Sequence, residues 1–219
     1  MLPVFLAALL QSVSLVTDIA PATSRLPTRV LLVVPTSNAL PTPMSTTRAE
    51  VGRIWRAAGV ELTWLSRLPR GELSFDRVIA VVVDDAAFAG SALPVGALGG
   101  VPMVAGRMRQ IVYLSPTAIK QLVAQAGVLP TGGQFGGAYA RMVGRVIAHE
   151  LGHLLLYSSA HRESGLMRPS FVARDVMSPN RDRFTLGGDD VQVVQQRVAE
   201  TRRLGERPGP VEALIARDR

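Results

Sequence analysis

The sequence predicts an α+β domain, and three observations support this class. Short β-branched runs and amphipathic helical stretches occur in the order strand, helix, strands, helix, helix, with no internal repeat. Hydrophobic residues make up 47% of the 219 residues and charged residues 19%, which favours a folded chain with a substantial core over a disordered chain. The longest helical stretch runs into a segment, residues 149–161, that holds all three histidines.

The first half of the chain predicts three strands and one helix. Residues 29–34 (RVLLVV) and 77–83 (RVIAVVV) are short β-branched apolar runs, which are typical of buried strands. Thr47 and Glu50 have the spacing of a capping box, and apolar residues behind them recur at helical spacing up to Gly59. Residues 60–64 alternate between apolar and polar, which predicts a half-buried strand.

The second half predicts a weak strand, a further strand and three helices. Residues 86–109 are rich in glycine, alanine and proline, and we expect a weak strand around 98–104. Residues 110–114 (QIVYL) predict another strand, and the Ser-Pro pair behind it opens a helix that stops at Gly127. The longest predicted helix covers residues 138–157, and a last helix covers about 189–203.

The two ends of the chain differ from its middle. Residues 2–16 carry no charge and Ala20-Pro21-Ala22 is a small-x-small site, so residues 1–22 are interpreted as a secretory signal peptide. We therefore expect a domain at 23–204 and a loose tail at 205–219, in a secreted or periplasmic location. The apolar run is short for a spanning helix, so no stable membrane insertion is expected after cleavage, although an uncleaved anchor is an alternative.

Composition excludes some classes of function. The chain has no cysteine, so disulfides, thiolate zinc sites and a thiol nucleophile are excluded. The net charge is +7, but the arginines are scattered and aromatic residues make up only 5%. This pattern indicates a generally basic, solvated surface rather than a nucleic-acid site.

The segment HELGH at residues 149–153 predicts a metal site. His149 and His153 are four residues apart, so on a helix they face the same side, about 6 Å apart along the axis. Two imidazoles at this spacing can bind one zinc ion. Glu150 stands next to the first histidine and can face a water molecule at the metal, which makes it the candidate general base.

A catalytic zinc ion needs a third protein ligand, and His161 is the candidate. In a continuous helix, His161 would lie about 12 Å beyond His153 along the axis, too far to share the ion. The helix must therefore end near Tyr157, and the chain must fold back. Otherwise His161 is a solvated loop residue, and the third ligand is one of three carboxylates: Glu163, Asp175 or Asp182.

This stretch resembles the metzincin zinc peptidases, whose motif is H-E-x-x-H-x-x-G-x-x-H followed by a methionine turn. His149, Glu150 and His153 match the motif. Leu156 and Ser159 occupy the positions of its glycine and last histidine, and the third histidine of this chain comes two residues later.

Two later segments extend the resemblance. SGLMRP at residues 164–169 is similar to the methionine turn of matrix-metalloprotease-like members, and FTLGGDDVQVVQ at 184–195 is similar to their last helix. The resemblance implies a mixed, twisted sheet with an active-site helix and a small C-terminal lobe. Substrate would lie extended in the cleft between the two lobes.

The resemblance also implies roles for single residues. Met167 would lie beneath the zinc ion as a hydrophobic floor, although Met177 is an alternative. Asp189 and Asp190 would be structural, one of them joining the last helix to the methionine turn. They could equally be an ordinary acidic helix start, which the helix dipole favours. The strand around 98–104 would be the edge to which an extended peptide adds.

The expected function is that of an exported zinc-dependent endopeptidase. Zn²⁺ would be held by His149, His153 and His161, and Glu150 would deprotonate a zinc-activated water that attacks a peptide or protein substrate. Two alternatives stay open, a non-catalytic zinc-containing domain that is structural or binds a peptide, and a membrane-anchored protease. The cleavage preference and the oligomeric state do not follow from the sequence.

Overall fold

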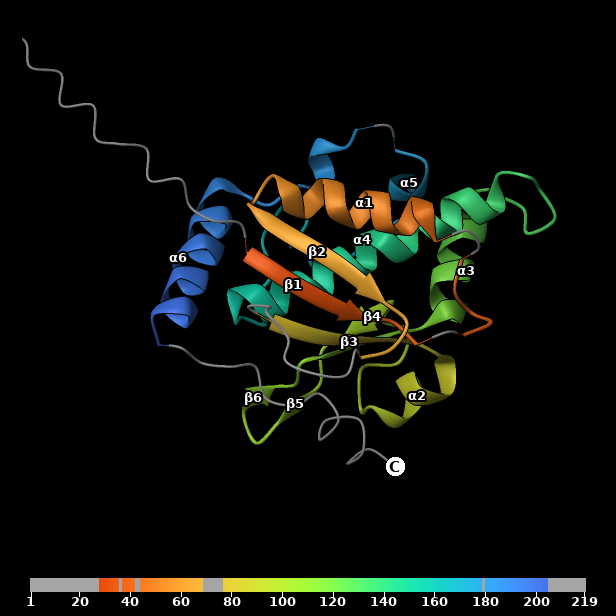
Figure 1. Cartoon of the computed structure of the whole chain (residues 1–219). Helices are drawn as coiled ribbons and strands as arrows, with labels where there is room; N and C mark the ends of the chain where they lie inside the picture. Colours follow the sequence, from red (N-terminus) through yellow and green to blue (C-terminus); the bar gives the residue numbers. More distant parts are fainter. Residues whose placement is uncertain (1–27, 36, 42–43, 69–76, 179, 205–219) are drawn as a thin grey trace, which may run out of the picture.

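The computed structural model describes residues 28–204 except for 36, 42–43, 69–76 and 179. The predicted α+β class is confirmed, because one mixed sheet and several helices pack together in this part of the chain (Figure 1). The expected signal segment at 1–22 and the expected tail at 205–219 lie outside the described residues. Within the described part, no helix has the length and apolar character needed to cross a membrane.

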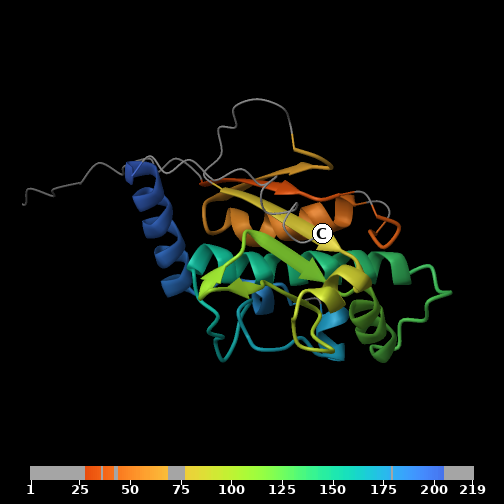
Figure 2. The same cartoon turned by 90° about the horizontal axis from the view of Figure 1, so that it is seen from below.

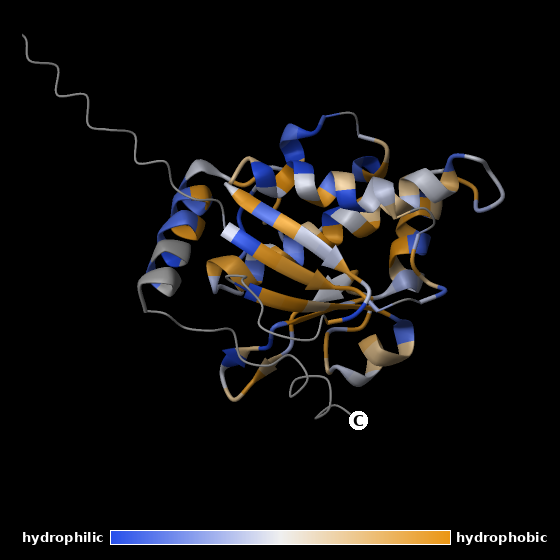
Figure 3. Cartoon of the chain, in the orientation of Figure 1, coloured by the Kyte–Doolittle hydropathy of each residue, from blue (hydrophilic) through white to orange (hydrophobic). Residues whose placement is uncertain are grey.

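The main sheet has five strands in the order β2-β1-β3-β7-β4. Four of them are parallel to one another: β1 (Thr28–Val33), β2 (Val60–Leu65), β3 (Arg77–Val83) and β7 (Ile111–Leu114). β4 (Gly99–Gly100) is antiparallel to β7 and lies at the edge. β1 and β3 are apolar along most of their length (Figure 3), as expected for parallel strands that are covered on both faces.

Two helices cover one face of the sheet and form the main core. α1 (Ser45–Arg56) and α4 (Phe135–Leu156) lie side by side on this face (Figures 1 and 2). Trp55 of α1 and Ile147 of α4 are fully buried there. The opposite face carries a smaller cluster around Phe88 of α2 (Asp85–Gly90). The long helix α4 therefore lies in the interior, which fixes the side chains that it presents.

The remaining helices surround α4. α3 (Pro116–Gln125) and α6 (Gly188–Leu204) both contact it. Between α4 and α6 lies the small C-terminal lobe, with only two short helices, α5 (Ala173–Val176) and η1 (Asp182–Phe184). The predicted small C-terminal lobe is thus present, and it packs against the helix that carries HELGH.

The sequence misplaced one strand and missed one helix. The strand expected around 98–104 is divided: β4 ends at Gly100, and β5 (Met103–Val104) pairs instead with β6 (Arg107–Met108) in a separate hairpin. Pro102 lies between them and has no N–H to donate to a sheet ladder. Helix α2 was not predicted, although Asp84 caps it by accepting a hydrogen bond from Ala87 N at 2.8 Å.

The predicted capping box at the start of α1 does not form. Thr47 Oγ1 instead donates a hydrogen bond to the carbonyl of Ala140 in α4, at 2.8 Å. The Glu50 carboxylate accepts a hydrogen bond from Nε of Arg145, also in α4, at 2.9 Å. Both side chains face the neighbouring helix. They therefore form hydrogen bonds to α4 and not to the backbone at the start of α1.

Candidate metal centre

The HELGH residues lie on the last two turns of α4. His149, Glu150 and His153 are all buried, and all three line one cleft. The helix holds the two histidines on one face, so their Nε2 atoms are only 3.1 Å apart. The helical spacing that the sequence predicted is therefore present at the site.

α4 ends near Tyr157, as the sequence predicted, although no glycine stops it. Tyr157 itself adopts the left-handed conformation, with φ of 51°, and its N–H donates to the carbonyl of His153. Ser158 N donates to the same carbonyl at 3.1 Å. The chain then reverses and returns His161 to the helix, with ring centroids 5.4 Å from His149 and 5.0 Å from His153.

The three histidines form one group whose ligand atoms all lie within 4.8 Å of one another. In a tetrahedral zinc site with bonds of roughly 2.0–2.1 Å, two ligand nitrogens lie about 3.3 Å apart. The separation of 3.1 Å between Nε2 of His149 and Nε2 of His153 is close to this value. The group is therefore able to bind one zinc ion, and the structure brings together all three histidines that the sequence singled out.

Backbone carbonyls orient the two buried rings. Nδ1 of His149 lies 2.8 Å from the carbonyl oxygen of Leu166, and Nδ1 of His153 lies 2.7 Å from that of Ser158. Because a carbonyl oxygen only accepts, each Nδ1 must carry the proton, which leaves a free lone pair on each Nε2. Two lone pairs that face each other repel unless a cation lies between them. The donor set thus fits a metal ion, with carbonyls as the outer partners of the ligands.

Burial keeps the same two histidines neutral. It lowers the pKa of His149 to about 4 and lowers the pKa of His153, and the carbonyl hydrogen bonds offset only part of this effect. Both rings are therefore uncharged at neutral pH. A neutral imidazole can bind a metal ion without first losing a proton.

Glu150 is a buried carboxyl group with no hydrogen-bond or ion-pair partner among the described residues. Burial raises its pKa to about 8. A cation at the histidines would favour the charged carboxylate and lower this pKa. β4 lies close by, since a Cβ on Gly99 would be 3.2 Å from Cγ of Glu150. An unpaired carboxyl beside a metal site can exchange a proton with a molecule in the cleft.

The structure distinguishes the two candidate methionines. Met167 is buried and packs under Gly152, where an added Cβ would lie 2.2 Å from the Met167 sulfur. Met177 has an exposed fraction of 46%. Met167 therefore lies against the helix between the two histidines, in the position implied for the hydrophobic floor.

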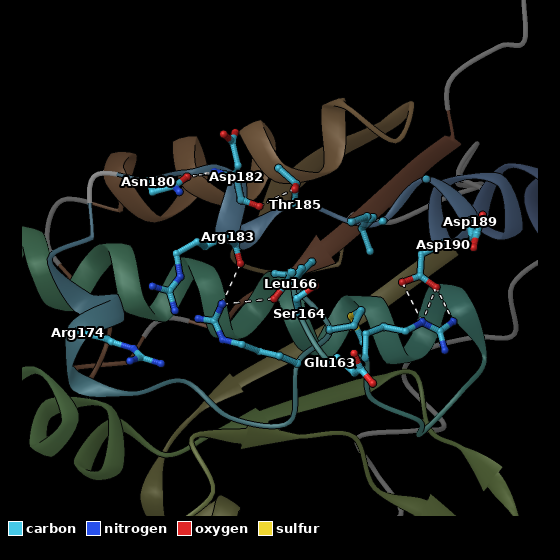
Figure 4. A pocket seen from close by; sticks show the side chains of 17 residues that line it. Glu163, Ser164, Leu166, Arg174, Asn180, Asp182, Arg183, Thr185, Asp189 and Asp190 are labelled. Carbon is cyan, nitrogen blue, oxygen red and sulfur yellow. Dashed lines mark hydrogen bonds and ion pairs between the residues drawn. The ribbon is translucent and has the colours of Figure 1, made fainter.

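The three alternative ligands lie elsewhere. Asp175 is fully buried and forms ion pairs with Arg168 at 2.8 Å and with Arg183 at 3.1 Å. Glu163 and Asp182 line a second hollow, of about 970 Å³, on the C-terminal lobe (Figure 4). None of these carboxylates belongs to the metal-binding group found among the described residues.

Asp190 joins α6 to the loop between His161 and Met167. Its carboxylate pairs with Arg162 at 2.6 Å (Figure 4), and Arg162 N donates to the carbonyl of Met167 at 2.8 Å. Asp190 is buried, whereas Asp189 is exposed. One of the two aspartates therefore has the structural role that the sequence resemblance implied.

Sequence reasoning missed the residues that support the site from behind. Arg145 is fully buried one turn before His149; besides Glu50, it binds the carbonyl of Asp175 and lies 3.8 Å from the centre of the Phe184 ring. A charged residue on an otherwise apolar helix face, four positions before a ligand, was the available signal.

Arg168 and Phe171 form a second group that supports the site, and Phe171 contacts His149 directly. Arg168 lies against two neighbouring aromatic rings, with its guanidinium 4.8 Å from the centre of Phe171 and 4.9 Å from that of Phe184. Phe171 makes a T-shaped contact with the His149 ring, at a centroid distance of 5.6 Å. No sequence pattern pointed to this stack, because its members meet only through the folding of the lobe.

The histidines and Glu150 lie in a cleft of about 770 Å³. α4 contributes to its base, and one wall comes from residues 93–101 with β4. Residues 168–171, the nearby face of α3 and residues of the β5–β6 hairpin also line it. The cleft is large enough for several residues of an extended peptide.

The comparisons with known proteins identify no family. No protein-family model matches the chain, and no curated protein sequence matches it. Among solved structures, the chain is similar to archaemetzincin from Methanopyrus kandleri, with 15% identity and a TM-score of 0.46 over 83% of this chain and 99% of that chain. A likeness this distant carries no weight for function, which therefore has to rest on the site.

Replacing His161 with alanine should remove most of the bound zinc. We expect about one zinc ion per chain for the parent protein, and a large loss for His161→Ala because two ligands hold zinc poorly. Elemental analysis after dialysis measures both. Glu163→Ala is the control and should keep its zinc. A variant His161→Ala with full zinc content would show that the third ligand is another residue.

Adding a methyl group under the site should weaken metal binding. In Gly152→Ala the new Cβ would collide with the Met167 sulfur, so the floor must shift, and we expect about a tenfold loss of zinc affinity. Competition with a chelating dye measures the affinity. Gly137→Ala, on the same helix with open space around it, should have no such effect. Equal affinities in the two variants would contradict this role of Met167.

Proposed function

We propose that this protein is a zinc-dependent endopeptidase of the metzincin type. One observation carries the proposal: three imidazoles converge in a cleft beside Glu150, a buried carboxyl group without a partner among the described residues. Structural zinc sites are usually closed by four protein ligands. The metal-binding group here has three members among the described residues, which leaves a position for a reacting molecule.

The proposed reaction is hydrolysis of a peptide bond. Zinc held by His149, His153 and His161 supplies Lewis acidity, which polarises a carbonyl group and makes water more acidic. Glu150 accepts a proton on its carboxylate as the water oxygen bonds to the carbonyl carbon. The C–N bond then breaks as Glu150 passes that proton to the amide nitrogen, which leaves as an amine.

The substrate would bind as an additional strand beside β4. β4 is the edge strand of the sheet, and both of its residues, Gly99 and Gly100, line the cleft. A peptide in extended form can pair its main chain with such an edge. Gly99 is packed closely against Val146 and Glu150, so the edge lies next to the proposed base.

Export of the protein is part of the proposal and rests on the first 22 residues. The uncharged run at 2–16 and the Ala20-Pro21-Ala22 site support cleavage after Ala22 and a secreted or periplasmic location. N-terminal sequencing of the protein from its host should then give a mature chain that begins near Thr23. A mature chain that begins at Met1 and stays with the membrane fraction would support an anchored protease instead.

Replacing Glu150 with glutamine should greatly reduce the rate of hydrolysis while zinc stays bound. Glutamine keeps the volume but cannot accept the proton, so we expect the rate to fall by about 10²–10⁴-fold. Digestion of a mixed peptide library and elemental analysis measure the two properties. Retained activity would refute Glu150 as the base. A zinc-loaded parent protein that cleaves no peptide at all would favour a non-catalytic domain.

A further inference from the structure

The walls of the cleft offer almost no free charge to a substrate. Among the described residues, and apart from the histidines, Glu150 and Arg168 are the charged residues that line it. Arg168 is already engaged, because it pairs with Asp175 at 2.8 Å and donates hydrogen bonds to three backbone carbonyls. The polar side chains on the α3 wall, Gln121 and Gln125, are uncharged. Charged residues make up 19% of the whole chain, so this lack is a property of the cleft.

Three exposed apolar residues belong to the segment that forms one wall of the same cleft or to the hairpin that follows it. Val95, Met103 and Val104 have exposed fractions of 103%, 55% and 53%, and we call these three residues the apolar rim. Met103 lines the cleft, and Val95 stands between two residues that do, Pro94 and Gly96. Exposed apolar residues that are contiguous with a cleft often mark a binding surface.

The hairpin that carries part of the apolar rim has a defined shape. β5 and β6 are joined by Ala105 and Gly106, which both have positive φ, 49° and 73°. Two such residues form the tight turn that matches the twist of paired strands. The hairpin projects from the main sheet (Figure 1), so Met103 is held at the cleft rather than folded into the core.

We propose that the cleft selects extended peptides with uncharged, apolar side chains around the scissile bond, and that the apolar rim recognises them. This inference rests on the proposed function. A charged side chain would lose its water in the cleft and find no partner there, which is unfavourable. An apolar side chain would gain from burial against the rim, and methionine can adapt its shape to different partners.

Cleavage of a mixed peptide library by the zinc-loaded protein tests the selectivity. Sequencing the products by mass spectrometry gives the residues on both sides of each cleaved bond. We expect apolar residues to be enriched there and Asp, Glu, Lys and Arg to be depleted by about tenfold or more. Cleavage with no preference, or with a preference for charged residues, would overturn the inference and leave the proposed function intact.

A charge placed on the apolar rim should change the preference in a defined direction. Met103→Arg should make acidic residues acceptable at one substrate position, because a partner is now present. Leu129→Arg is the matched control, since Leu129 is exposed at 68% but does not line the cleft. Identical cleavage profiles for the two variants would overturn the role of the rim. The same holds if Met103→Arg changes only the elution volume in size-exclusion chromatography and leaves the cleavage profile unchanged.

Binding measured without cleavage separates the inference from the proposed function. Fluorescence anisotropy of labelled peptides on the zinc-loaded Glu150→Gln variant gives affinities for matched apolar and charged sequences. Tighter binding of the apolar peptide, by about tenfold, would support the inference even if the parent protein hydrolysed nothing. Equal affinities would overturn the inference even if the parent protein proved to be a protease.

Discussion

The site depends on the hydrogen bonds of one buried side chain, the guanidinium of Arg145. It lies on α4 one turn before His149 and forms hydrogen bonds to Glu50 of α1 and to the carbonyl of Asp175 in the C-terminal lobe. Removing one partner of such a buried network leaves an uncompensated charge, which typically costs about 3–5 kcal/mol. Burial tends to raise the pKa of Glu50, but hydrogen bonds from Arg53 and Arg145 outweigh it, so the pKa is lowered and the carboxylate stays charged. α4, which carries His149 and His153, is thereby fixed both to α1 and to the C-terminal lobe.

The lobe beyond α4 is small, and polar groups supply much of its order. Asp175 is fully buried, and it joins Arg168 and Arg183 while its side chain also accepts a hydrogen bond from Val172 N. A segment of this size has little apolar surface to bury, and the chain has no cysteine with which to form disulfides. The buried ion pairs and the stacked arginine side chains hold the loop that returns His161 and Met167 to the helix.

The candidate centre follows from the way this loop meets the helix. Carbonyls of Ser158 and Leu166 accept hydrogen bonds from the two buried histidines. The loop that brings His161 to the site therefore also orients the rings of the other two histidines. His161 comes two residues later than the last histidine of the metzincin motif, and the sharp turn at Tyr157 still brings it back to His153. Glu150 has no partner among the described residues, and the neighbouring strand presents glycine rather than a polar side chain to it. The apolar rim adds a neutral surface to the same cleft.

Local periodicity and residue chemistry were enough to predict the α+β class, the main strands and helices, and the HELGH spacing. The group that joins the two helical histidines could be identified only from the folded chain, since His161 and the carboxylates Glu163, Asp175 and Asp182 were all compatible with the spacing. The fold also determines that Thr47 and Glu50 contact α4 instead of capping α1, that Pro102 divides the edge strand, and that Arg145 lies in the core. These outcomes follow from contacts between segments that are distant in the chain. A local pattern carries no information about which distant partner will satisfy a polar group.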